Sequence, residues 1–78
     1  MNPRVKQVQP ANDFTLELLF TNGERKVFDL KPYLDFGVFS ELKDPSLFHT
    51  VRTLSGSIVW KNGIDICPDT LYLESIKK

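Results

Sequence analysis

The chain has 78 residues, of which 41% are hydrophobic and 26% are charged. This composition excludes a disordered segment and predicts a single domain over residues 1–78, near the lower size limit for burying a core. Ten Lys and Arg residues balance ten Asp and Glu residues, so no overall charge attracts nucleic acid or anionic lipid. Because the core is small, a homodimer or a partner protein that covers further apolar surface is expected.

The cysteine content and the hydropathy pattern indicate a compartment. Cys67 is the only cysteine, which excludes a disulfide within the chain and with it the usual support of small secreted domains. The N-terminal residues lack the apolar region of a signal peptide, and the apolar runs are too short to span a membrane. We therefore expect a cytoplasmic protein that does not bind a membrane.

The N-terminal third of the chain predicts strands. Residues 5–8 are compatible with a short strand, and the period of two over residues 14–20 is typical of a half-buried one, with these apolar positions on one face: Phe14, Leu16, Leu18, Phe20. The Asn22-Gly23 pair then predicts a hairpin with a two-residue turn, which pairs Leu18 with Val27. This register places Phe28 on the opposite face from Leu18, so both faces of the hairpin are expected to carry apolar area.

The middle of the chain predicts only short helical pieces. Pro32 and Gly37 bound a helical turn over residues 31–36, and the apolar residues near its end are expected to dock this segment onto the sheet: Phe36, Val38, Phe39, Leu42. Asp44 before Pro45 predicts an N-capped helix over residues 46–50 that points Leu47 and Phe48 inward. The lack of a long amphipathic helix argues against a bundle and against a helix-turn-helix.

The C-terminal third predicts a second hairpin and a helix. Residues 51–54 and 57–60 flank Ser55-Gly56, which pairs Val51 with Trp60, and Asn62-Gly63 returns residues 64–66 beside Val59. Asp69 is expected to cap a final short helix with these residues on one face: Leu71, Tyr72, Ser75, Ile76. The predicted fold is α+β, a small antiparallel sheet of two hairpins with short helical segments between them and a short C-terminal helix.

Turns and aromatic residues recur over nearly the full chain with a distinctive spacing: Phe20-Thr21-Asn22-Gly23-Glu24, Phe28-Asp29-Leu30, Leu42-Lys43-Asp44, Phe48, Trp60-Lys61-Asn62-Gly63-Ile64-Asp65, Pro68-Asp69-Thr70-Leu71-Tyr72. This pattern resembles the prokaryotic Domain of Unknown Function 2442 family, in which proline is common at the position of Lys61. The resemblance implies a small α+β module without an established activity. It also implies a neighbouring small protein, in arrangements suggestive of a toxin–antitoxin pair, and in some members a fused helix-turn-helix domain.

Two aromatic residues and a turn residue are candidates for contact with a partner. Trp60 and Tyr72 could form an exposed aromatic platform, because Trp and Tyr are enriched at interface hot spots. The favoured interpretation is that Trp60 covers the core of the second hairpin. Asn62 is most simply a turn residue, with a binding role as the second interpretation.

Asp65 and Asp69 complete the candidate set for partner contact. Together with Asp29 they could bind Mg²⁺ or Ca²⁺, or form an acid–base pair, if the two hairpins share a sheet. Helix capping by Asp69, and pairing of the other two carboxylates with Lys or Arg on neighbouring strands, explain them better. We therefore predict no metal, no cofactor and no catalytic residue.

The nucleophile candidates lack a surrounding motif. His49, the only histidine, could in principle activate Ser40, Ser57 or Cys67, but none of these lies in a nucleophile motif. A charge at a helix C-terminus, or a packed side chain, explains His49 better. Cys67 is expected to be a small buried residue, although the start of a helix would lower its thiol pKa.

These observations favour a non-catalytic module that binds another small protein, as the antitoxin-like or regulatory half of a two-protein system. The alternative is an accessory module for transcription regulation that contacts nucleic acid through Arg25, Lys26 and Lys31. An enzyme that uses the region of Asp65 and Asp69 is the third hypothesis.

Overall fold

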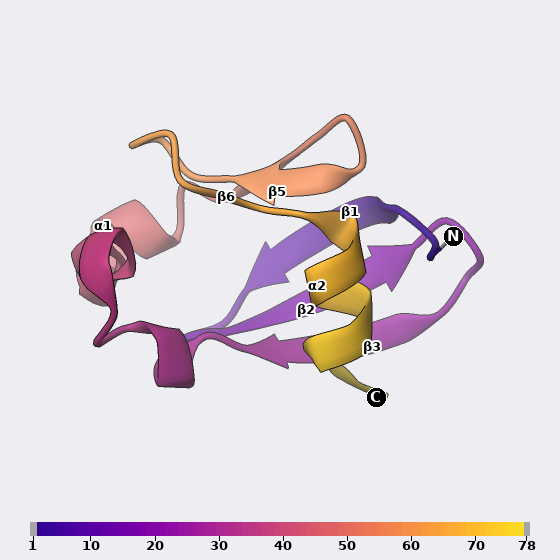
Figure 1. Cartoon of the computed structure of the whole chain (residues 1–78), viewed down its shortest axis with the longest axis horizontal. Coiled ribbons are helices and arrows are strands. Elements are labelled where there is room, and N and C mark those ends of the chain that lie inside the picture. The colour runs from indigo at the N-terminus through magenta and orange to yellow at the C-terminus, as the bar shows by residue number, and fades with distance from the viewer. Residues whose placement is uncertain (1, 78) are drawn as a thin grey trace.

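The computed structural model describes residues 2–77, which form two antiparallel sheets and short helices (Figure 1). The four-stranded sheet has the order β1-β2-β3-β7, with these bounds: β1 Val5–Pro10, β2 Thr15–Phe20, β3 Arg25–Asp29, β7 Ile76–Lys77. The three-stranded sheet has the order β4-β5-β6: β4 Arg52–Leu54, β5 Ser57–Val59, β6 Asp65–Ile66. The predicted α+β class is confirmed.

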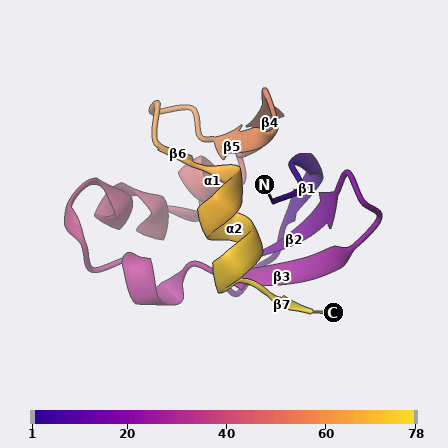
Figure 2. The ribbon, with the colours of Figure 1, turned by 45° about the vertical axis from the view of Figure 1, so that its right-hand side comes forward.

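The helical segments are short and lie between and after the hairpins: η1 Lys31–Tyr33, η2 Gly37–Lys43, α1 Pro45–Phe48, α2 Pro68–Glu74. Figures 1 and 2 show α2 across one face of the four-stranded sheet, with the three-stranded sheet at the N-terminal end of this helix. No helix among residues 2–77 has the length and apolar character needed to cross a membrane.

The register of the first hairpin differs from the expected one. Gly23 adopts a φ of +88°, and its amide donates to the carbonyl of Phe20 at 2.9 Å, which makes a three-residue loop instead of a two-residue turn. The extra loop residue pairs Leu16 with Phe28, so Phe28 lies on the core face and is buried. The prediction that Phe28 adds apolar area to the second face of the hairpin was therefore wrong.

The second hairpin has the expected register. Ser55 and Gly56 both adopt positive φ, as a two-residue primed turn requires, and Arg52 pairs with Val59. The expected pair of Val51 with Trp60 has the same register but lies one residue beyond the ends of β4 and β5. The return of residues 64–66 is also confirmed, because Asp65 pairs with Val59.

The capping of α1 was predicted correctly, whereas that of α2 was not. The carboxylate of Asp44 accepts a hydrogen bond from the amide of Ser46 at 3.0 Å. In α2 the N-cap is Cys67, and Asp69 lies within the first turn, because Pro68 takes the first helical position. The helix ends at Glu74, and Ile76 and Lys77 form β7 against β3 instead of continuing its face, which the sequence pattern did not predict.

One hydrophobic core joins the two sheets and the helices, and these are its largest fully buried side chains: Trp60, Phe20, Phe28, Phe48, Leu16, Leu18, Leu30, Leu42, Ile58, Leu71. The Trp60 side chain is 2% exposed, and its Nε1 donates to the carbonyl of Phe48 at 3.0 Å. The indole therefore fastens the second hairpin to α1, in agreement with the favoured interpretation of Trp60.

Candidate functional site

The segment from η1 to η2 carries three aromatic side chains, of which one is exposed and two are half-buried. Tyr33, Phe36 and Phe39, here called the aromatic ladder, are spaced three residues apart: Tyr33 ends η1, Phe36 lies between the helices and Phe39 belongs to η2. Backbone hydrogen bonds of the same spacing join them: the Phe36 amide donates to the Tyr33 carbonyl and the Phe39 amide to the Phe36 carbonyl, both at 3.0 Å. The two bonds close successive turns, and Phe36 between them has an extended backbone, with φ −109° and ψ 114°.

The two ends of the ladder are held by the core, while its middle is not. The Tyr33 ring stacks on the buried Phe28 ring with centroids 5.5 Å apart, and it lies 5.9 Å from the Phe39 ring. Phe36 is 67% exposed and Val38 is 60% exposed. The expectation that both would dock onto the sheet was wrong, because Leu42 and the partly buried Phe39 supply the contacts with the core instead.

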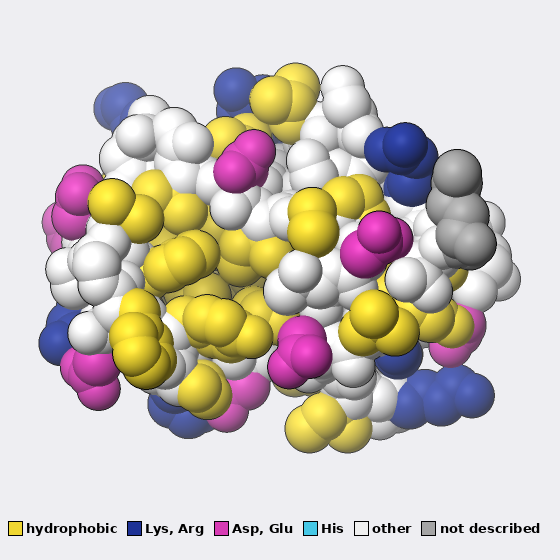
Figure 3. Space-filling view, viewed as in Figure 1, with side chains coloured by type: hydrophobic (Ala, Val, Ile, Leu, Met, Phe, Trp, Pro, Cys, Tyr) yellow, Lys and Arg dark blue, Asp and Glu magenta, His cyan; other side chains and the backbone are white. Residues whose placement is uncertain are grey.

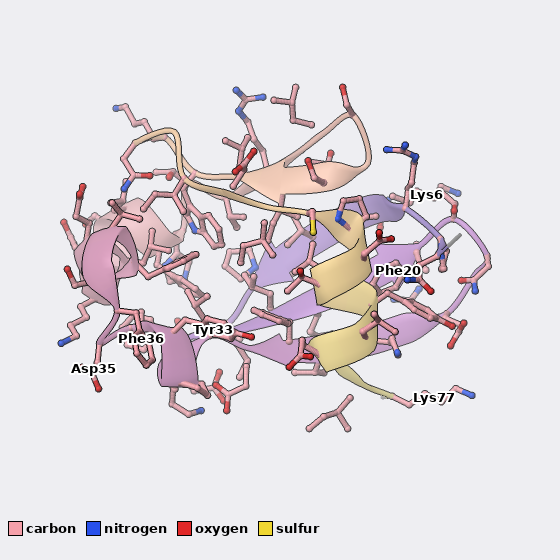
Figure 4. The ribbon with its side chains drawn as sticks, in the orientation of Figure 1. Lys6, Phe20, Tyr33, Asp35, Phe36 and Lys77 are labelled. Carbon is pink, nitrogen blue, oxygen red and sulfur yellow. The ribbon has the colours of Figure 1, made fainter. Side chains whose placement is uncertain are left out.

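The ladder belongs to a broad apolar surface. Figure 3 shows hydrophobic side chains gathered around a shallow hollow on one face of the molecule, on the side where Figure 4 places Tyr33 and Phe36. Large exposed apolar patches on small proteins are commonly sites of contact with other molecules. This surface is therefore the strongest candidate for a functional site among the described residues.

Charged groups of both signs border the ladder. Lys43 Nζ lies 3.1 Å from Asp35 Oδ1, and the two side chains are 56% and 84% exposed. Glu41 accepts a hydrogen bond from the side chain of Asn62 at 3.2 Å. This bond brings the predicted candidate Asn62 to the edge of the ladder segment.

The other predicted partner-contact residues are distributed over the surface and the core. Asn62 also acts as a turn residue, because its Oδ1 accepts from the amide of Ile64 at 3.2 Å. Asp65 is exposed on β6, and Asp69 lies 3.4 Å from the side-chain amide of Asn2. Trp60 is buried, so the structure does not bring it to the surface with Tyr72. A binding role for the exposed candidates stays a prediction.

Tyr72 fastens α2 to the first hairpin. Its hydroxyl donates to Glu24 Oε1 at 2.6 Å, and Lys26 Nζ donates to the Tyr72 carbonyl at 2.7 Å while lying 4.0 Å from the ring centroid. The hydrogen bond from Tyr72 lowers the pKa of the Glu24 carboxyl, with a further contribution from Asn22. The same hydrogen bond raises the pKa of the Tyr72 phenol. These contacts account for Tyr72 as a structural residue.

The three expected nucleic-acid contacts do not gather on one surface. Lys26 is engaged with Tyr72, and Lys31 Nζ lies 3.4 Å from Asp29 Oδ1. Arg25 precedes Lys26 on β3, so its side chain points to the opposite face of the sheet. These three residues therefore do not form the basic patch that the alternative hypothesis requires.

His49 and Cys67 both lie at helix ends. His49 is the C-cap of α1, and its Nδ1 lies 2.8 Å from the carbonyl of Pro45. Cys67 is exposed, so the expected burial was wrong; its Sγ lies 3.1 Å from Thr70 Oγ1. Hydrogen bonding from the Thr70 side chain, and then from its amide, lowers the pKa of the Cys67 thiol.

No group of three or more His, Cys, Asp or Glu side chains within residues 2–77 could hold a metal ion. A shared site of Asp29, Asp65 and Asp69 would require both hairpins to lie in one sheet. The two hairpins belong to different sheets.

Sequence reasoning missed the ladder as a surface. The spacing of Tyr33, Phe36 and Phe39 by three residues is typical of 3₁₀ turns and could have indicated this segment. Hydrophobicity alone suggested burial for Phe36 and Phe39.

A comparison with family models matches residues 5–77 to the family described as protein of unknown function (DUF2442). Neither the curated proteins nor the solved structures include a significant match to this chain.

Proposed function

The chain belongs to the DUF2442 family, and we propose that it is a non-catalytic interaction module that binds another small protein through the aromatic ladder. The supporting observation is that Phe36 is 67% exposed, in a segment that the partly buried rings of Tyr33 and Phe39 attach to the core. A partner that covers Phe36 removes a large apolar area from water without any rearrangement of the fold. A binding surface that already has its bound shape loses little conformational entropy on association.

The two-protein system implied by the family resemblance supplies the expected partner. The proposed role is that of the antitoxin-like or regulatory half of such a pair in the prokaryotic cytoplasm. The product of the adjacent gene is accordingly the partner to test first.

The test is co-expression of the chain with that product, followed by co-purification and growth measurements. We expect the natural chain to co-purify and to relieve any growth defect that the partner causes alone. Phe36→Ser should lose both effects, while Leu54→Ser, a matched change at another exposed apolar residue on β4, should keep them. Failure of the natural chain to co-purify, or equal behaviour of the two variants, would contradict the proposal.

A further inference from the structure

The surface around the aromatic ladder contains both a projection and a recess. Phe36 projects into solvent, and Figure 3 shows a hollow lined by hydrophobic side chains on the same face. A two-fold symmetric interface uses the same surface on both copies, so a group that projects from one part of the patch can fill a recess in another part. The ladder surface has both features.

Charges of both signs border the ladder, as suits an interface between two identical surfaces. Asp35 and Lys43 lie side by side, and both side chains remain more than half exposed although they form an ion pair. In a symmetric interface the acidic group of one copy can face the basic group of the other. A partner with a uniformly basic or acidic surface would leave one of these two groups facing a like charge.

The charge of the whole chain does not oppose self-association. Ten basic residues balance ten acidic ones, so two copies approach without net repulsion. Aromatic side chains such as that of the exposed Phe36 are also enriched in protein interfaces.

From these observations we propose that a second copy of this chain covers the aromatic ladder, in a two-fold dimer in which Phe36 of each copy packs into the hollow of the other. The inference rests on the proposed function in its use of the same surface: the second copy occupies the ladder when the partner protein is absent, and the partner replaces it. The expected pairing across the rim is Asp35 with Lys43 of the other copy.

Sedimentation equilibrium of the purified full chain tests the dimer. The average mass should rise from 9.0 kDa toward twice that value as the concentration rises from about 10 µM to about 1 mM. Phe36→Ser should weaken dimerisation by about a hundredfold or more, since both copies lose the buried ring, and Leu54→Ser should leave it unchanged. A monomeric natural chain over the whole range, or a dimer that Phe36→Ser does not weaken, would overturn the inference.

Reversal of one rim charge distinguishes a second copy from a basic partner. Lys43→Glu leaves the rim acidic, so it should weaken the dimer by about three- to tenfold at low salt and by less at high salt. A basic partner would instead bind this variant more tightly. A dimer strengthened by Lys43→Glu would contradict the proposed pairing.

A measurement on the unmodified sequence avoids dependence on any variant. In a mixture of isotope-labelled and unlabelled chains, contacts observed by NMR between copies should join the Phe36 ring to Tyr33 or Phe39 of the other copy. Contacts confined to any other surface would overturn the inference. If the chain forms the dimer but does not bind the adjacent gene product, this inference stands and the proposed function is contradicted. If the chain is a monomer that binds that product, the proposed function stands and this inference is contradicted.

Discussion

At the scale of single residues, Gly56 determines how closely the two sheets approach. Its carbonyl accepts a hydrogen bond from the amide of Val5 at 2.9 Å, which joins β1 to the turn between β4 and β5. The position has a φ of +87°, and a Cβ atom there would lie 2.8 Å from the Cβ atom of Arg4. Glycine is therefore required both by the backbone conformation and by the space.

Gly56→Ala is predicted to lower the free energy of unfolding by about 2–4 kcal/mol, from the left-handed backbone and from the displacement of Arg4. Gly63→Ala is the control, because its φ is +92° but no atom lies within 4 Å of the added Cβ. Gly63→Ala should lower the free energy of unfolding by about 1–2 kcal/mol, from the left-handed backbone alone. Urea denaturation of both variants measures the difference, and equal losses would show that the contact with Arg4 has no effect.

The two Asn-Gly pairs build the same loop. In each, the asparagine Oδ1 accepts from the amide two residues later, at 3.1 Å for Asn22 and 3.2 Å for Asn62. In each, the glycine alone takes a positive φ, and its amide donates to the carbonyl three residues earlier. The local side-chain bond thus favours a three-residue loop over the two-residue turn that Asn-Gly also permits.

At the scale of elements, the contacts of Tyr72 hold α2 against the first hairpin. Glu24 accepts from Tyr72, and Lys26 reaches the carbonyl of Tyr72 near the end of the helix. The helix is seven residues long and depends on such tertiary contacts, because isolated helices of this length are not stable in water.

The stability of the fold should depend on pH through this contact. The pKa of the Glu24 carboxyl is lowered from 4.5, so its carboxylate stabilises the folded state above that pH and this contribution is lost as the pH falls through the folded pKa. The pKa of Tyr72 is raised from 10.0, so its contribution is present below pH 10 and is lost as the pH rises through the folded pKa. Tyr72→Phe should therefore reduce the fall in Tm at both ends of the pH range.

Thermal melts of the natural chain and Tyr72→Phe between about pH 3 and about pH 11 measure this dependence. Asp13 is the control, since its pKa is also lowered, by Thr15, away from the helix. Thr15→Val should change the fall in Tm at acid pH but leave the fall in Tm at alkaline pH intact. If Tyr72→Phe showed the same fall in Tm as the natural chain at both ends of the pH range, the contact between Tyr72 and Glu24 would not be the source of the alkaline fall.

At the scale of the whole molecule, two phenylalanines close in sequence have separate roles. Phe48 is 1% exposed, its ring lies 5.2 Å from the Phe14 ring, and its carbonyl accepts from Trp60. Phe36 lies outside this core. The fold thus places one aromatic residue for stability and the other for contact with solvent or with another molecule.

Phe48→Ala is predicted to lower the free energy of unfolding by about 3–5 kcal/mol, the usual cost of removing a buried aromatic ring. Phe36→Ser should change it by no more than about 0.5 kcal/mol, as expected for a surface position. Urea denaturation at low protein concentration, at which no dimer forms, measures both values. A large loss in Phe36→Ser would mean that the ladder stabilises the fold of the single chain.

The sequence by itself determined the α+β class, the register of the second hairpin and the cap at Asp44. These features depend on residues close together in the chain, such as Ser55-Gly56 and Asp44-Pro45, whose backbone preferences act locally. Only the tertiary structure decided the register of the first hairpin, the strand at Ile76, the exposure of Cys67 and the exposure of Phe36. Hydrophobicity does not specify which apolar side chains the other elements cover, because burial depends on segments that are far apart in the chain and meet only in the folded molecule.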